Sequence, residues 1–144
     1  MLRKLAFSLL ILLAIAAAPH GSRAQSASDA DQAIFKQIIT DQIAAFNADD
    51  SARAYSYAAP TIQALFPSPE IFLSMVKNGY RPVYRQKSFA FGEITEAAGR
   101  PVQHVTIVDA TGKLWTALYT MQKQPDGSWR ISACVLVEMP GADA

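Results

Sequence analysis

The hydrophobic pattern of this 144-residue chain changes its period once, and that change limits the fold more than any other feature. Between residues 31 and 77 the apolar side chains recur every three or four positions, as they do in helices that pack on a core. After Tyr80-Arg81-Pro82 the period becomes two, which is typical of strands with one buried face. Helices followed by strands predict an α+β domain, with N-terminal helices packed on a bent antiparallel sheet of about four strands.

The segment 46–66 holds paired aspartates, an arginine and two tyrosines, and it has the composition of a site. We interpret it as the junction between helices, because Asp49 or Asp50 can cap a helix that starts near Ser51. Pro60 suits the first turn of the next helix. The expected helices span about residues 31–48, a short segment from residue 51, residues 60–66 and residues 70–77. Asn78-Gly79 is expected to end the last of these in a left-handed conformation.

The second half predicts strands over residues 83–96, 101–109, 113–124 and 129–138, with turn residues between them. Gly92 is expected at a β-bulge, because the apolar parity changes between Phe91 and Ile94. If Gln124 opposes Trp129, the last hairpin has two partly apolar faces. One face then carries Trp115, Tyr119, Met121 and Leu136. One helical layer cannot cover both faces, so we predict a homodimer through this second face.

The N-terminus has the features of a secretory signal. Arg3 and Lys4 precede a 14-residue uncharged, mostly apolar run, too short to span a membrane, and Ser22 and Ala24 fit a signal-peptidase site. We therefore predict a signal peptide over residues 1–24, a periplasmic or secreted location, and no stable membrane insertion after cleavage. The remaining divisions are a flexible lead-in over 25–30, a single domain over 31–139 and a C-terminal tail over 140–144.

Charge and cysteine content remove several function classes. Loss of residues 1–24 removes three of the 13 basic residues and none of the 12 acidic ones, so the mature chain has a net charge near −2. No nucleic-acid partner is expected from such a chain. Cys134 is the only cysteine, which excludes an internal disulfide, and its strand-like surroundings predict a buried thiol. Metal-binding and phosphate-binding motifs are absent, so no metal or cofactor is predicted.

Several short motifs point to a known family. They are Ala45-Phe46-x-Ala48-Asp49-Asp50, Pro60-x-Ile62-Gln63, Phe72-x-x-Met75-Val76, Gly79-Tyr80-x-Pro82-Val83-Tyr84 and Asp126-Gly127-x-Trp129-Arg130-Ile131-Ser132. Over nearly all of residues 33–137 the chain resembles a family of small exported bacterial proteins described as domain of unknown function 4864. That family is similar in layout to the nuclear-transport-factor-2-like, or SnoaL-like, cone. The resemblance implies a cone-like, cystatin-like roll around a pocket, and no established catalytic residues.

The aromatic residues exceed what one helix–sheet contact needs, which favours an apolar pocket between helices and sheet. The candidate lining residues are Tyr55, Gln63, Phe66, Tyr80, Tyr84, Arg85 and Phe91. The leading hypothesis is a non-enzymatic exported domain that binds a small apolar ligand or an envelope protein partner.

Two alternatives stay open. The first is a cone-type isomerase, cyclase or hydratase, which needs a general base; His104, Glu93 and Asp50 are the candidates. A lone histidine on a strand is more often structural than catalytic, so no catalytic residue is assigned. The second alternative is a structural module that acts as a homodimer.

Overall fold

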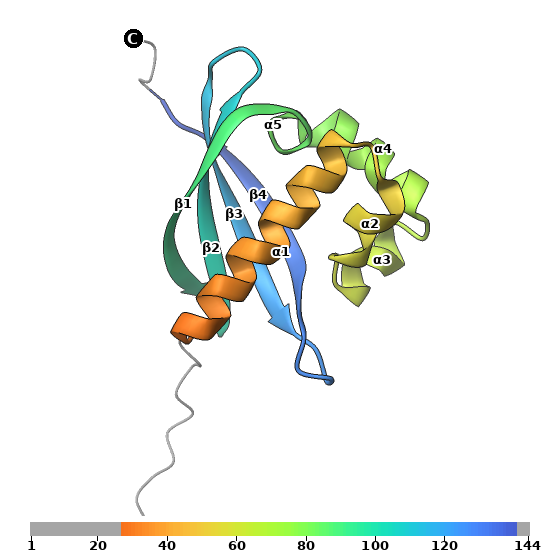
Figure 1. Cartoon of the computed structure of the whole chain (residues 1–144), viewed down its shortest axis with the longest axis vertical. Helices are drawn as coiled ribbons and strands as arrows, with labels where there is room; N and C mark the ends of the chain where they lie inside the picture. The colour runs from red at the N-terminus through yellow and green to blue at the C-terminus, as the bar shows by residue number, and fades with distance from the viewer. Residues whose placement is uncertain (1–26, 141–144) are drawn as a thin grey trace, which may run out of the picture.

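The computed structural model describes residues 27–140, in which five helices precede four strands (Figure 1). The helices are α1 (Asp29–Asn47), α2 (Ser51–Ser56), α3 (Pro60–Leu65), α4 (Pro69–Gly79) and α5 (Arg81–Tyr84). The strands are β1 (Gln86–Ala97), β2 (Arg100–Asp109), β3 (Leu114–Lys123) and β4 (Trp129–Glu138). They form one antiparallel sheet in the order β1-β2-β3-β4, so the predicted α+β class is confirmed.

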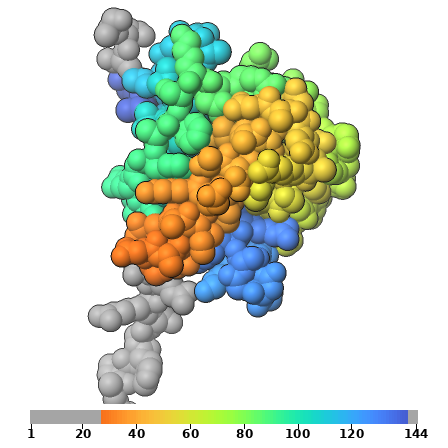
Figure 2. Space-filling model, in the orientation of Figure 1, coloured from red at the N-terminus to blue at the C-terminus, as the bar shows by residue number. Residues whose placement is uncertain are grey.

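Helix α1 lies along one face of the sheet, with the α2–α4 cluster beside it near β4 (Figure 1). Its buried side chains include Phe35, Ile39, Ile43 and Phe46, whose spacing of three and four places them on one helix face. The helix begins two residues before the expected Asp31, because Ser28 and Asp31 form a capping box. The space-filling view shows α1 and the α2–α4 cluster as one continuous layer (Figure 2).

The junctions between helices follow the caps that the sequence contains. Asp50 accepts a hydrogen bond from the Arg53 amide and caps α2, as expected. Ser68 caps α4 in the same way. The expected left-handed stop at Gly79 is wrong, since Gly79 is not among the residues with a positive φ. Instead, Pro82 lies in the first turn of α5, and β1 starts three residues later than predicted.

The predicted bulge in β1 is confirmed. The pairing of β1 with β2 shifts between Phe91 and Ile94, so Gly92 and Glu93 lack regular partners. On β2, the buried Gln103 side chain donates to the carbonyl oxygens of Gly92 and His104, at 3.0 Å and 2.9 Å, and thereby supports the irregular segment. This bulge bends the edge of the sheet.

A second irregularity was not predicted and lies in β4. Thr120 pairs with Ala133, but the next residue, Met121, pairs with Ile131, so Ser132 is an extra residue in β4. An extra residue reverses the parity of the strand on either side of it. Trp129 accordingly opposes Lys123 and not Gln124, and the expected division of the hairpin into two faces is wrong.

The predicted dimer face is wrong, because this register places its residues on the helical side of the sheet. Tyr119 and Met121 lie beneath the helices, with exposures of 1% and 0%, and Trp115 and Leu136 pack against the same core. These four side chains are therefore not available to a second subunit as an open apolar face. The outer face carries Val135 and Val137 instead, which are about half exposed. Dimerisation itself stays a prediction.

Three of the predicted segments extend beyond residues 27–140. The signal peptide over 1–24 lies outside the described residues, as do residues 25–26 of the lead-in and residues 141–144 of the tail. Within the described part, no helix is both long enough and apolar enough to cross a membrane.

Candidate functional site

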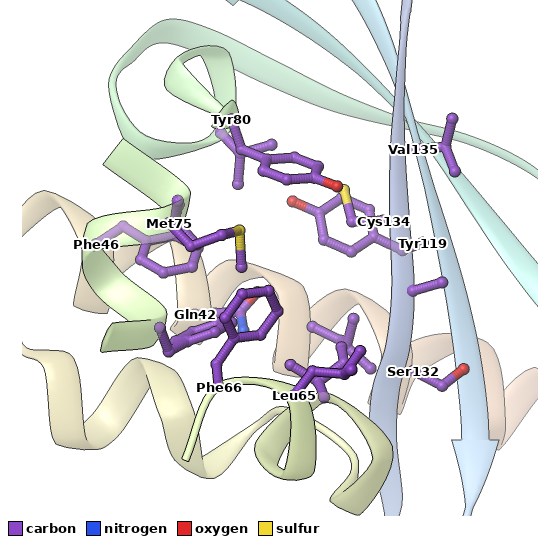
Figure 3. A pocket seen from close by; sticks show the side chains of 16 residues that line it. Gln42, Phe46, Leu65, Phe66, Met75, Tyr80, Tyr119, Ser132, Cys134 and Val135 are labelled. Atoms are coloured by element: carbon purple, nitrogen blue, oxygen red, sulfur yellow. The ribbon is translucent and has the colours of Figure 1, made fainter. Parts of the chain in front are cut away.

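A cleft of about 430 Å³ lies between the edge strand β4 and helices α3 and α4 (Figure 3). We call it the α4–β4 cleft. Its lining residues are Gln42, Phe46, Ile62, Leu65, Phe66, Phe72, Met75, Val76, Tyr80, Val83, Tyr119, Ile131, Ser132, Ala133, Cys134 and Val135. The volume lies within the range of ligand pockets, and protein interiors rarely leave such space unfilled.

The cleft exists because large side chains on the helices face small ones on the strand. On the helical side, Phe46, Phe66 and Phe72 form a tilted aromatic cluster, with ring centroids 6.1 Å and 6.5 Å from Phe72. On the sheet side, β4 presents its backbone at residues 132–133 and the short Cys134 side chain, because Ser132 is the extra residue of the bulge and Cys134 pairs with the buried Tyr119. Neither this backbone nor the Cys134 side chain reaches the aromatic rings, so the space between them stays open.

One end of β4 is closed by backbone hydrogen bonds, and this closure sets the position of the cleft. The Ile131 amide donates to the Tyr57 carbonyl at 2.9 Å, and the Ala59 amide donates to the Ile131 carbonyl at 2.8 Å. The α2–α3 connection therefore pairs with the edge strand at this one residue. Beyond it the helices separate from β4, and the cleft begins.

The mouth of the cleft is apolar. Leu65 lines the cleft, yet its exposure is 74%. An exposed leucine side chain on the wall of a cavity marks a place where the cavity meets solvent. Figure 3 shows Leu65 and Phe66 at the end away from Tyr80. An apolar molecule can thus enter without passing a charged side chain among the lining residues.

Two of the polar lining side chains are already used by the fold. The Gln42 amide nitrogen donates to the Ala54 carbonyl at 3.1 Å, which ties α1 to α2. The Ser132 hydroxyl donates to the Thr120 carbonyl at 3.2 Å across the β4 bulge. Both side chains thus have hydrogen-bond partners within the protein and do not need a ligand to provide one.

The remaining polar groups gather at the other end of the cleft, where Figure 3 shows Tyr80, Tyr119 and Cys134. Tyr119 is 1% exposed, and its buried hydroxyl has no partner with hydrogen-bond geometry; only the Cys134 thiol, a weak hydrogen-bonding group, lies beside it. Burial raises the pKa of Tyr119 well above its ordinary value, and the neighbouring Cys134 thiol raises it further. Burial also raises the pKa of Cys134, to about 12. Both groups are therefore neutral and protonated at physiological pH.

The family comparison agrees with the sequence motifs. The family described as Domain of unknown function (DUF4864) matches residues 28–144, which is most of the chain. The chain belongs to the DUF4864 family. The comparison with curated proteins found no match.

In this DUF4864 protein, two of the seven predicted pocket residues line the cleft, namely Phe66 and Tyr80. Tyr55 and Gln63 lie behind its wall. The Tyr55 hydroxyl donates to the Gln63 and Phe66 carbonyls at 3.1 Å and 2.7 Å, and the Gln63 side chain donates back to the Tyr55 carbonyl. These bonds join α2 to α3 and hold the Phe66 side of the cleft.

The other three predicted pocket residues lie elsewhere. Tyr84 and Arg85 stack with 3.9 Å between the guanidinium carbon and the ring centroid, and both bind the Asp49 carboxylate. Hydrogen bonding from Tyr84 and the positive charge of Arg85 hold the pKa of Asp49 below its ordinary value. This cluster secures Asp49, whose φ of 52° is unusual for a non-glycine residue. Phe91 packs edge-on against Phe89 on β1, outside the cleft.

The three candidate catalytic residues do not meet at one site. Asp50 is the exposed cap of α2. The His104 ring on β2 is 2.8 Å from the Thr95 hydroxyl and 3.9 Å from the Glu93 carboxylate, which is largely exposed. None of the three lines the α4–β4 cleft. Among the described residues, no group of three or more histidine, cysteine, aspartate or glutamate side chains is placed to hold a metal ion.

Sequence reasoning missed the residues that distinguish this cleft, above all Tyr119. Tyr119 was predicted to lie on the outer face of the sheet, because the bulge at Ser132 in the neighbouring strand was not foreseen. That bulge has no signal in the sequence comparable to the glycine at residue 92. One signal was present: Ser132, Ala133 and Cys134 are three consecutive small side chains in an otherwise bulky strand. Such a run opposite phenylalanines indicates either close packing or a cavity.

Proposed function

We propose that this protein is an exported, non-enzymatic binder of a small apolar molecule, which it holds in the α4–β4 cleft. The observation that carries the proposal is a cleft of about 430 Å³ with aromatic and aliphatic walls and no acidic, basic or histidine side chain among its lining residues. A site of this kind gains binding free energy by removing apolar surface from water. Export is proposed from the N-terminal sequence alone.

The placement of the candidate bases favours binding over catalysis. A general base must lie within hydrogen-bond reach of the proton that it removes. His104 and Glu93 lie at the bulge between β1 and β2, and Asp50 lies at the start of α2, so none of them lines the cleft. The lining tyrosine hydroxyls can orient a ligand, and nothing beside them supplies a base.

Binding is tested with N-phenyl-1-naphthylamine, an uncharged apolar probe whose fluorescence rises when it leaves water. We expect saturable binding with a Kd on the order of 1–100 µM, given its size and the loss of rigid-body freedom. Met75→Trp should weaken binding at least about tenfold, because the Met75 side chain extends into the cleft and a larger ring fills it.

The matched control is Ile71→Trp, one turn earlier on α4. Ile71 is 50% exposed and does not line the cleft, so this variant adds the same ring to the same helix and should bind as wild type does. Absence of saturable binding to wild type, or equal loss in both variants, would contradict the proposal. Native mass spectrometry of the protein purified from its own periplasm would identify the natural ligand, and an N-terminus at Gln25 would support export.

A further inference from the structure

We propose that the ligand of the α4–β4 cleft is uncharged and carries a hydrogen-bond acceptor, such as a carbonyl oxygen, that accepts from the Tyr119 hydroxyl. The inference rests on the proposed function and adds the chemical class of the ligand. It depends on one side chain that is buried, polar and without a hydrogen-bond partner while lining a cavity.

A buried hydroxyl is almost always hydrogen-bonded in folded proteins, so an unpaired one requires an explanation. Tyr119 is 1% exposed, and its neighbour Cys134 offers only a thiol, which is a weak hydrogen-bonding group. The hydroxyl stays protonated because burial disfavours the phenolate. It can therefore donate a hydrogen bond, and an acceptor on the ligand would satisfy this donor, for which the lining offers only the weak Cys134 thiol.

The surroundings of Tyr119 also determine the charge of the ligand. The lining residues include no lysine or arginine that would neutralise a carboxylate or phosphate, and no aspartate or glutamate that would pair with an amine. Burial of an unpaired charge is far more costly than burial of a neutral carbonyl group that is hydrogen-bonded. Tyr80 supplies a second hydroxyl at the same end of the cleft (Figure 3). A neutral ketone, ester or amide with an apolar body fits this arrangement.

Three naphthalenes of nearly equal shape test whether the cleft prefers a neutral ligand with an acceptor, a neutral ligand without one, or an anion. Each is measured by its displacement of N-phenyl-1-naphthylamine at neutral pH. They are 2-acetylnaphthalene, which carries a carbonyl; 2-ethylnaphthalene, which lacks it; and 2-naphthoate, which is an anion. Wild type should bind the ketone roughly five- to tenfold more tightly than the hydrocarbon, as expected for one hydrogen bond between neutral groups. The anion should bind more weakly than the ketone.

Tyr119→Phe should reduce the preference for ketone over hydrocarbon to less than about twofold while the hydrocarbon still binds. Cys134→Ser is a second variant that does not remove the ring; its hydroxyl offers Tyr119 an internal acceptor, so the ketone preference should fall there too. The control is Tyr84→Phe, whose hydroxyl binds Asp49 away from the cleft. It should keep the wild-type preference.

The outcomes separate the two proposals. Equal binding of ketone and hydrocarbon to wild type overturns the assignment of Tyr119 and leaves the cleft as an apolar site. A ketone preference that survives in Tyr119→Phe, or tightest binding of the naphthoate, overturns it as well. If neither the probe nor any naphthalene binds wild type, the proposed function fails together with this inference.

Discussion

Replacement of Tyr119 by phenylalanine should stabilise the ligand-free protein, although most substitutions in a core destabilise. The hydroxyl of this 1%-exposed residue has no hydrogen-bond partner, so the folded state loses the hydration of the hydroxyl without replacing it. An unsatisfied buried polar group costs about 1–3 kcal/mol. Because water in the cleft offsets part of that loss, we expect the free energy of unfolding to rise by about 1 kcal/mol.

The assay is urea unfolding of protein that has been refolded from denaturant to remove bound ligand. With a slope of about 1–3 kcal/mol per molar urea, the expected gain moves the midpoint upward by roughly 0.3–1 M. Tyr55→Phe is the matched control. The Tyr55 hydroxyl donates to two carbonyls, at 2.7 Å and 3.1 Å, so its removal should lower the midpoint. A clear loss of stability in Tyr119→Phe would show that the hydroxyl is satisfied in the ligand-free protein, and the reasoning about the cleft would be refuted.

Three further predictions concern stability and reactivity. Trp129→Ala should lower the free energy of unfolding, because Trp129 packs edge-on against Phe35 with 4.8 Å between the ring centroids. Truncating a fully buried tryptophan costs about 3–5 kcal/mol, and since Trp129 is only partly buried we expect a loss near the lower end in urea titrations; a loss below about 1 kcal/mol would contradict this contact. Cys134 should react with a disulfide reagent at mildly alkaline pH at least about a hundredfold more slowly in folded than in unfolded protein, since burial raises its pKa to about 12. Hydrogen bonds from Thr111 and Trp115 lower the pKa of Asp109 in the folded protein. The ionised carboxylate therefore adds to the free energy of unfolding above its ordinary pKa of 3.8, and this stabilisation is lost as the pH falls below that value. Acid titrations of stability should therefore be flatter in Asp109→Asn, and an unchanged titration would contradict this role.

The elements of the fold could be predicted from the sequence because their signals are local. The change of period near Pro82 separates helices from strands, and β4 occupies the predicted residues 129–138. Asp50 caps a helix as its side chain predicts, and Gly92 marks a bulge. Errors occurred where two local signals compete, as at Gly79, where proline at residue 82 begins another helix before the sheet starts.

The faces of the sheet could not be predicted, because they depend on pairing between strands. One extra residue at Ser132 moves Trp129 and Ile131 to the helical side of the sheet. The same error assigned Tyr119 to an outer surface, although it is the most informative residue of the cleft. A site built on strand parity is thus less predictable than a site built on a motif.

The cleft and the unpaired hydroxyl are best explained together. The space beside Ser132 and Ala133 deprives Phe66 and its aromatic neighbours of packing partners, which weakens the fold. The Tyr119 hydroxyl, at the other end of the same space, weakens it for a different physical reason. A larger side chain that fills the space, as in Met75→Trp, would correct the first defect, and phenylalanine at 119 would correct the second. One neutral ligand with an apolar body and a carbonyl group corrects both at once, so binding accounts for two features that imperfect packing would leave unrelated.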